Sequence, residues 1–141
     1  MSNPATAPRQ AVDDSFPSSG LHIAKAADAT FETGLRGHFA YRNLGMDTVT
    51  NGKVQAHIIK PTRPSSEPGD EHMHRLNFQM LYIISGWARM PFTGHGEVRL
   101  EAGDSWYQEP SMRHAMIEYS DDLELLEITI PADFETISFD D

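Results

Sequence analysis

The stretch DEHMHRLNFQMLYIISGW, residues 70–87, places two histidines shortly before a long apolar run that a single amide interrupts. In an extended segment His72 and His74 point to the same face, because side chains alternate from face to face. Two imidazoles side by side make one half of a metal site. Such a pair also occurs by chance on many protein surfaces, so it does not establish a metal site alone.

The apolar run 78–84 predicts a strand that is buried on both faces. Gln79 lies in phase with Leu81 and Ile83 on one of those faces. Burying an unpartnered amide costs about 1 to 3 kcal/mol, so we expect Gln79 to have a partner. Gln79 either forms a hydrogen bond with a backbone group or binds a metal ion through its side-chain oxygen.

The rest of the chain shows short strands separated by turn residues and no sustained helical period. We predict strands at His38–Arg42, Val54–Lys60, Phe78–Ser85, Ala88–Phe92, Glu97–Leu100, Ser105–Gln108, His114–Tyr119 and Glu124–Ile130. A short helix is predicted at Ala26–Thr33, and Pro61–Asp70 is a loop that leads into the histidine pair. Many short, regularly spaced strands are typical of an all-β sandwich or barrel.

The length of 141 residues fits one compact domain. Residues 1–20 are rich in Pro, Ser, Ala and Asp and lack periodicity, so we predict a flexible N-terminal tail followed by a single domain over residues 21–141. The first 20 residues have no apolar core of the kind a signal peptide needs. No apolar run approaches the roughly 18 residues of a membrane span. We therefore expect a cytoplasmic protein.

The charge and the cysteine count limit the possible functions. The net charge is −10, from 21 acidic and 11 basic residues, and such a surface repels nucleic-acid backbones and anionic membranes. We expect no nucleic-acid or membrane partner. The chain has no cysteine, so a metal must be held by His, carboxylate or amide groups, which suit zinc, iron, nickel or manganese.

A second informative stretch is AGDSWYQEPSMRHAM, residues 102–116. Gly103 and Asp104 predict a turn, and a short strand follows it. Residues 109–111, Glu-Pro-Ser, predict another turn, after which His114 begins the next strand. A lone histidine at a strand start is more often structural than ligating.

Together these segments resemble the cupin superfamily, in particular small single-domain bacterial cupins. The spacing His72-x-His74-x4-Gln79-x6-Gly86 is similar to the first cupin motif, with Gln79 in place of the usual glutamate. The stretch 103–114 is similar to the second motif, G-x5-P-x-G-x2-H. This chain departs from that motif at two positions, with Glu109 in place of the proline and Ser111 in place of the glycine. Outside the motif, Glu118 stands where asparagine is frequent, and Ser66, with Gly69 nearby, stands where an upstream glycine is usual. The resemblance covers residues 52–130.

This resemblance implies a small antiparallel double-stranded β-helix, the RmlC-like jelly-roll barrel. It also implies one divalent metal ion inside the barrel, held by His72, His74, Gln79 and His114. No catalytic residue is identified. We assign no role to the remaining histidines, which are His22, His38, His57 and His95.

A neutral amide in place of glutamate leaves the ion its full charge, which favours Lewis-acid chemistry on an enolisable, aromatic or polyketide-like small molecule. The resemblance then favours a metal-dependent cyclase, isomerase or lyase. Two alternatives remain open: a cupin dioxygenase with a three-histidine iron or nickel centre, and a non-enzymatic module that binds or senses a small molecule.

The side chains on the outward face of the expected strand 78–85 indicate self-association. Phe78, Met80, Tyr82 and Ile84 lie out of phase with Gln79, and an exposed apolar row of this kind needs a cover. We expect a twofold homodimer. The alternative is that the chain's own segment Leu21–Asn43 folds over the row.

Overall fold

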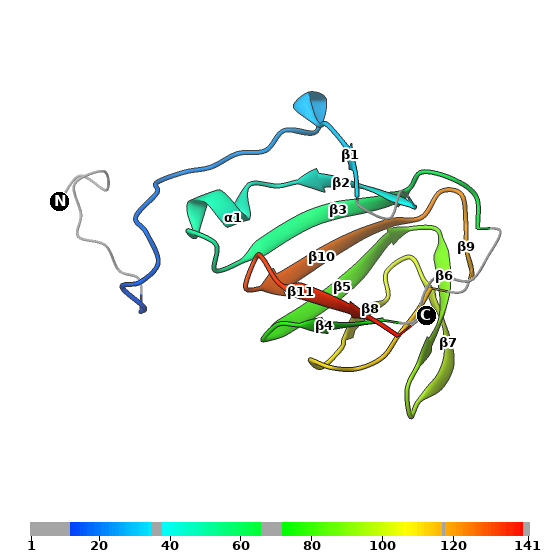
Figure 1. The fold of residues 1–141 in the computed structure, drawn as a ribbon. Helices are drawn as coiled ribbons and strands as arrows, with labels where there is room; N and C mark the ends of the chain where they lie inside the picture. Colours follow the sequence, from blue (N-terminus) through cyan, green and yellow to red (C-terminus); the bar gives the residue numbers. More distant parts are fainter. Residues whose placement is uncertain (1–11, 35–37, 66–71, 117, 140–141) are drawn as a thin grey trace.

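The computed structural model describes residues 12–34, 38–65, 72–116 and 118–139, and its ordered elements are almost all β-strands (Figure 1). The larger sheet has the order β1-β2-β3-β10-β5-β8, and every neighbouring pair is antiparallel. Its strands are β1 (Glu32–Thr33), β2 (Phe39–Asn43), β3 (Gln55–Pro61), β10 (Glu124–Ile130), β5 (Phe78–Ser85) and β8 (Ser105–Tyr107).

The opposite wall of the barrel consists of two smaller groups of strands. The first has the order β7-β6-β9, from β7 (Gly96–Glu101), β6 (Trp87–Phe92) and β9 (Glu118–Tyr119). The second pairs β11 (Glu135–Ser138) with β4 (His72–Arg75). His114 forms bridges to both His72 and Phe92, so it connects the two groups. This all-β, antiparallel jelly-roll barrel confirms the expected fold class.

The core lies between the two walls. Ile59, Leu81 and Ile83 of the larger sheet pack in one cluster with Ala88 and other apolar residues of the opposite wall. Gln79, Leu81 and Ile83 are buried, as their common phase predicts. The other face of β5 differs from the expectation of burial on both faces, because Tyr82 and Ile84 are 41% and 45% exposed in the single chain.

The predicted strands correspond to β2, β3, β5, β6, β7, β8 and β10, with ends that agree to within one residue. The predicted strand His114–Tyr119 is wrong at residues 114–116, because among the described residues of this range only Glu118 and Tyr119 are in β9, and His114 makes isolated bridges instead. The prediction did not include β1, β4 and β11. The expected loop Pro61–Asp70 lies partly outside the described residues, as do Ser66 and Gly69.

The predicted helix Ala26–Thr33 is also wrong. Only the 3-10 turn η2 (Ala26–Asp28) forms there, and it has no buried residue. A helix this short, with no apolar face to bury, is not stable alone. Glu32 and Thr33 pair with β2 instead. One helical turn, α1 (Met46–Val49), lies between β2 and β3.

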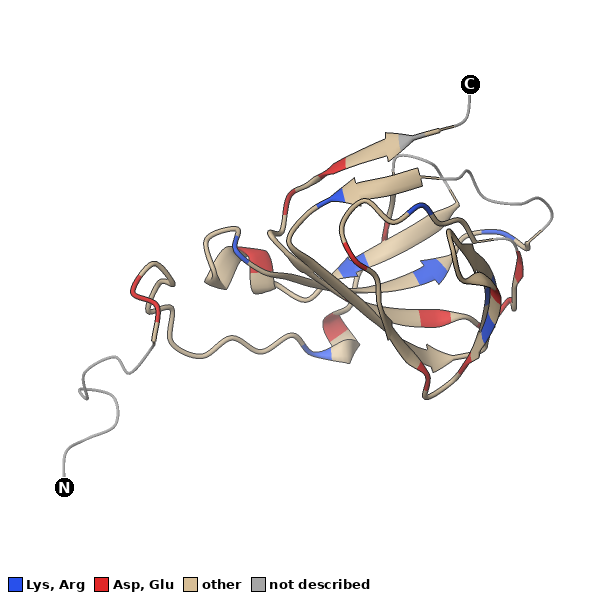
Figure 2. Ribbon diagram, turned by 90° about the horizontal axis from the view of Figure 1, so that it is seen from below, with Lys and Arg blue, Asp and Glu red and all other residues tan. Residues whose placement is uncertain are grey.

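The segment that precedes β1 begins away from the barrel and runs back to it past α1 (Figure 2), where the Ala24 carbonyl accepts a hydrogen bond from Arg42. The first 11 residues of the predicted flexible tail lie outside the described residues. Within residues 12–20, Ser19 Oγ donates a hydrogen bond to Val49 O at 3.0 Å. Among the described residues, no helix has the length and apolar character that crossing a bilayer requires.

Candidate metal centre

Three of the predicted ligands come together in the structure. The side chains of His72, His74 and His114 offer nitrogen atoms that all lie within 4.8 Å of one another. The ring of His114 is 4.3 Å from that of His72 and 5.0 Å from that of His74, measured between centroids. His114 is buried, and the other two are half-buried. The cluster therefore joins residues 42 positions apart in the sequence, from His72 to His114.

Backbone pairing holds the three histidines together. His72 and His114 exchange both of their backbone hydrogen bonds, each at 3.0 Å, as a directly opposed antiparallel pair does. The Ser111 N–H donates to the His74 carbonyl at 3.4 Å. The turn that precedes His114 is thereby attached to the strand that carries His74.

Side-chain contacts fix the orientation of two of the rings. His114 Nδ1 lies 3.1 Å from the Met112 carbonyl. A carbonyl only accepts hydrogen bonds, so Nδ1 carries the proton and the lone pair of the neutral ring is on Nε2. His74 Nδ1 lies 2.9 Å from Thr136 Oγ1, and its ring packs edge-on against Phe134. Such contacts are typical of imidazoles that bind a metal through the other nitrogen.

Gln79 is 2% exposed and has two side-chain partners. Its Nε2 donates to Glu127 Oε2 at 2.8 Å, and its Oε1 accepts from Gln108 Nε2 at 3.1 Å. Gln108 Nε2 also lies 3.1 Å from His114 Nε2, so one amide group connects Gln79 to the histidine cluster. A carbonyl oxygen has a second lone pair. Coordination of a metal by Gln79 stays a prediction.

Glu127 is a buried carboxylate that the sequence analysis did not identify. Its Oε1 lies 2.5 Å from His57 Nε2, and only 11% of its side chain is exposed. Burial raises the pKa of the Glu127 carboxyl, but the hydrogen bond and charge of His57, the hydrogen bond from Gln79 and the charge of His74 outweigh it. The net pKa lies below the usual value, so Glu127 is ionised near neutral pH.

Trp106 completes this set of buried polar contacts. Its indole Nε1–H donates to Gln108 Oε1 at 3.0 Å. An indole N–H only donates and a carboxylate only accepts. The direction of every hydrogen bond from Trp106 through Gln108 and Gln79 to Glu127 is therefore fixed at both ends.

Sequence reasoning missed Glu127, His57 and Gln108. A signal for Glu127 was present, since it alternates in phase with the apolar Leu125 on a strand whose inward residues are buried. His57 faces Glu127 directly in the register of β3 and β10. The remaining histidines lie elsewhere: His22 contacts the Leu44 carbonyl, His38 contacts Arg63, and His95 is exposed at a turn.

The donor set fits a divalent transition metal. Three imidazole nitrogens suit zinc, iron or nickel, and an amide oxygen can serve as a further ligand. Thr129, which pairs with Gln79 in the register of β10 and β5, is fully buried. Its hydroxyl has no hydrogen-bond partner among the described residues. A buried hydroxyl left in this way costs about 1 to 3 kcal/mol, which favours a water or a polar ligand group beside Gln79.

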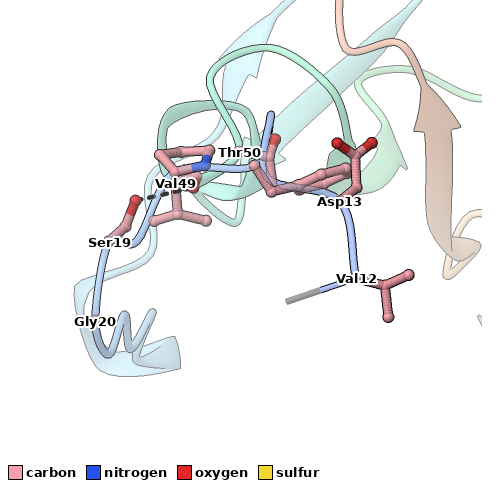
Figure 3. Close-up of a pocket in the computed structure, with 8 residues that line it drawn as sticks. Val12, Asp13, Ser19, Gly20, Val49 and Thr50 are labelled. Atoms are coloured by element: carbon pink, nitrogen blue, oxygen red, sulfur yellow. Dashed lines mark hydrogen bonds between the residues drawn. The ribbon is translucent and has the colours of Figure 1, made fainter. Parts of the chain in front are cut away.

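Two cavities differ in their relation to this cluster. The larger, about 510 Å³, lies between residues 12–20 and α1, and none of the three clustered histidines lines it (Figure 3). The smaller, about 300 Å³, is bordered by Phe92, Arg113 and His114. Only the second gives a small molecule a place beside the histidines.

Comparison with known proteins agrees with this architecture. The family model described as a cupin domain matches residues 58–129, which is more than half of the chain. The chain belongs to the cupin family. No curated protein sequence matches it.

Solved structures similar to this cupin show the same fold at low sequence identity. The polyketide cyclase RemF from Streptomyces resistomycificus matches with a TM-score of 0.69 and 9% identity, over 86% of this chain and 87% of that one. KdgF from Halomonas sp. matches with a TM-score of 0.63 and 16% identity, over 77% and 94%. An RmlC-like cupin from Shewanella frigidimarina matches with a TM-score of 0.62 and 23% identity, over 80% and 93%.

Two positions at which the cupin motifs have glycine form sharp turns in this chain. Gly86 has φ of +75°, and a Cβ there would lie 2.9 Å from the Leu123 backbone. Ser111, at a motif glycine position, has φ of +72°. The backbone of the second motif thus keeps a conformation that favours glycine, although the residue is serine.

Proposed function

We propose that this cupin is a metal-dependent enzyme that acts as a Lewis acid on a small enolisable or aromatic, polyketide-like molecule. The reaction would be of the cyclase, isomerase or lyase type. The single observation that carries the proposal is the cluster of His72, His74 and His114, whose nitrogen atoms lie within 4.8 Å of one another. We propose these three as nitrogen ligands and Gln79 as an oxygen ligand.

The surroundings of Gln79 support its place in the ligand set. Its amide nitrogen is directed to Glu127, so its oxygen faces Gln108 and thus the side of the barrel that holds His114. One lone pair of that oxygen accepts from Gln108, and the second remains for a ligand bond. Gln108 Nε2 lies 3.1 Å from His114 Nε2, and because that nitrogen has a single lone pair, a bound ion would replace this contact.

A bound divalent ion would polarise a carbonyl oxygen and stabilise the negative charge of an enolate. The chain itself supplies a water-poor wall from Phe92, Trp106 and Met112. The two oxygens of Glu127 already accept hydrogen bonds from His57 and Gln79, so this carboxylate does not reach a substrate. The described residues therefore support stabilisation of charge more than proton abstraction by a carboxylate.

Elemental analysis of the natively expressed protein tests the metal site. We expect about one metal per chain in the unaltered protein, and loss of that metal in the variant His72→Ala/His74→Ala, because a single imidazole does not hold a divalent ion. His95→Ala is the matched control, since His95 is an exposed histidine at a turn. Retention of one metal per chain by the double variant would show that the site assignment is wrong.

Acetylacetone, a small chelating enol, tests the reaction class. We expect binding to the metal-loaded protein, seen as a change in its ultraviolet absorption, without consumption of oxygen. Oxygen consumption in step with loss of acetylacetone would instead indicate a dioxygenase. A protein that neither retains nor takes up zinc, iron or nickel would be a metal-free binding module.

A further inference from the structure

The buried carboxylate of Glu127 is placed so that it selects the orientation of the Gln79 amide. It belongs to β10, the strand next to β5, and its carboxylate oxygen Oε2 accepts from Gln79 Nε2 at 2.8 Å. An amide side chain can turn over and exchange its oxygen and nitrogen with little change of shape. A carboxylate accepts only, so it selects the orientation that presents nitrogen to it.

We propose that Glu127, anchored by His57, is a positioning residue that holds the Gln79 oxygen toward the histidine cluster. The inference rests on the proposed function, in which Gln79 binds the metal. It assigns roles to two residues that lie outside the ligand set.

His57 keeps the carboxylate in place from the other side. Its Nε2 lies 2.5 Å from Glu127 Oε1, and its ring packs edge-on against Tyr41 with centroids 5.1 Å apart. Since the carboxylate is acceptor-only, His57 Nε2 carries the proton. The charge of His74, on the opposite wall of the barrel, also acts on the Glu127 carboxylate.

The opposite end of the chain of hydrogen bonds enforces the same orientation independently. Trp106 donates to Gln108 Oε1, so the Gln108 nitrogen must face both Gln79 and His114. The contacts at both ends of this series of hydrogen bonds therefore require the Gln79 oxygen to point away from Glu127. Two amides in series do not pass protons readily, so this arrangement orients groups and is not a proton relay.

The same geometry explains why position 79 is not a glutamate. A glutamate there would put two carboxylates in direct contact inside the barrel, and a buried like-charge pair forces one of them to take up a proton. With Glu127 present, an amide at position 79 is the compatible partner.

Titration with Co²⁺ alone tests this role in the full-length protein, by affinity and by the visible absorption bands that report ligand geometry. For Glu127→Gln we expect an affinity loss of about 10- to 100-fold and a changed spectrum, because His57 would hold the new amide oxygen and turn its amide nitrogen toward Gln79 Nε2, so that two donors would face each other. Glu124→Gln is the matched control on the same strand, half-buried and out of phase with Glu127. It should bind Co²⁺ as the unaltered protein does.

Exchanging the residues at positions 79 and 127 tests whether Glu127→Gln acts only by lowering the stability of the barrel. Gln79→Glu alone should lower the melting temperature, while Gln79→Glu/Glu127→Gln should recover it and bind Co²⁺, because donor and acceptor have changed places. If Glu127→Gln keeps the affinity and spectrum of the unaltered protein while His72→Ala/His74→Ala loses Co²⁺, the positioning role is wrong and the metal site stands. If the unaltered protein binds no Co²⁺, the proposed function fails and this inference with it.

Discussion

Ser111 has a left-handed backbone in the turn that leads into His114, with φ of +72°. Serine pays roughly 1 kcal/mol for this conformation, whereas glycine adopts it freely. The turn keeps this shape because its N–H is bonded to the His74 carbonyl and His114 is paired with His72. The site therefore imposes a strained conformation on a residue that the local sequence does not favour.

Ser111→Gly should raise the free energy of unfolding by about 0.5 to 1 kcal/mol, measured by chemical denaturation. Ser105→Gly is the control, because Ser105 is an exposed residue within β8. Glycine in a strand should lower stability there by roughly 0.5 to 1 kcal/mol. Equal losses in the two variants would show that the backbone at position 111 is not strained.

Among the elements, β5 and β10 could be predicted to the residue, because each is an apolar run bounded by turn residues and each crosses the core. The strands that carry the site were harder to predict from the sequence. β4 and β11 are short and form a sheet of only two strands, so no apolar alternation marks them in the sequence. Motif spacing predicted the three clustered histidines. The pair His57 and Glu127 was not predicted, because residues 70 positions apart meet only through strand pairing.

The ribbon of β4 and β11 supports His74 from outside the cluster. Thr136 Oγ1 lies 2.9 Å from His74 Nδ1. Thr136→Val removes this hydroxyl with little change of shape, so we expect metal affinity to fall about tenfold, measured by Zn²⁺ titration with a competing chelator.

Glu135→Gln is the control for this variant, since it alters the neighbouring residue of β11, whose ion pair with Arg75 is 3.9 Å long and well exposed. Such a pair contributes about 0 to 1 kcal/mol, and Zn²⁺ affinity should not change. An equal loss in both variants would mean that β11 acts through strand stability and not through the Thr136 hydroxyl.

At the scale of the whole molecule, the outer face of the larger sheet carries several exposed apolar side chains. Tyr82, Ile84, Tyr107 and Ile130 are 41%, 45%, 57% and 37% exposed. The described part of the segment Leu21–Asn43 leaves these four side chains exposed, and its strands β1 and β2 extend the sheet beyond β3, on the far side of β10 from β5. Leu21 and Ile23 are themselves 86% and 65% exposed. We propose a second copy of the chain as the cover.

We therefore expect a twofold dimer through the outer row of β5, with a mass twice the 15.8 kDa of the chain in light scattering at micromolar concentration. In a twofold interface each substitution appears on both sides, so Ile84→Glu would bring two carboxylates into one apolar contact and should give the single-chain mass. Thr93→Glu adds the same charge at an exposed residue between β6 and β7 and should leave the dimer intact. A mass of 15.8 kDa for the unaltered protein at this concentration would contradict the dimer and leave the outer row exposed to solvent.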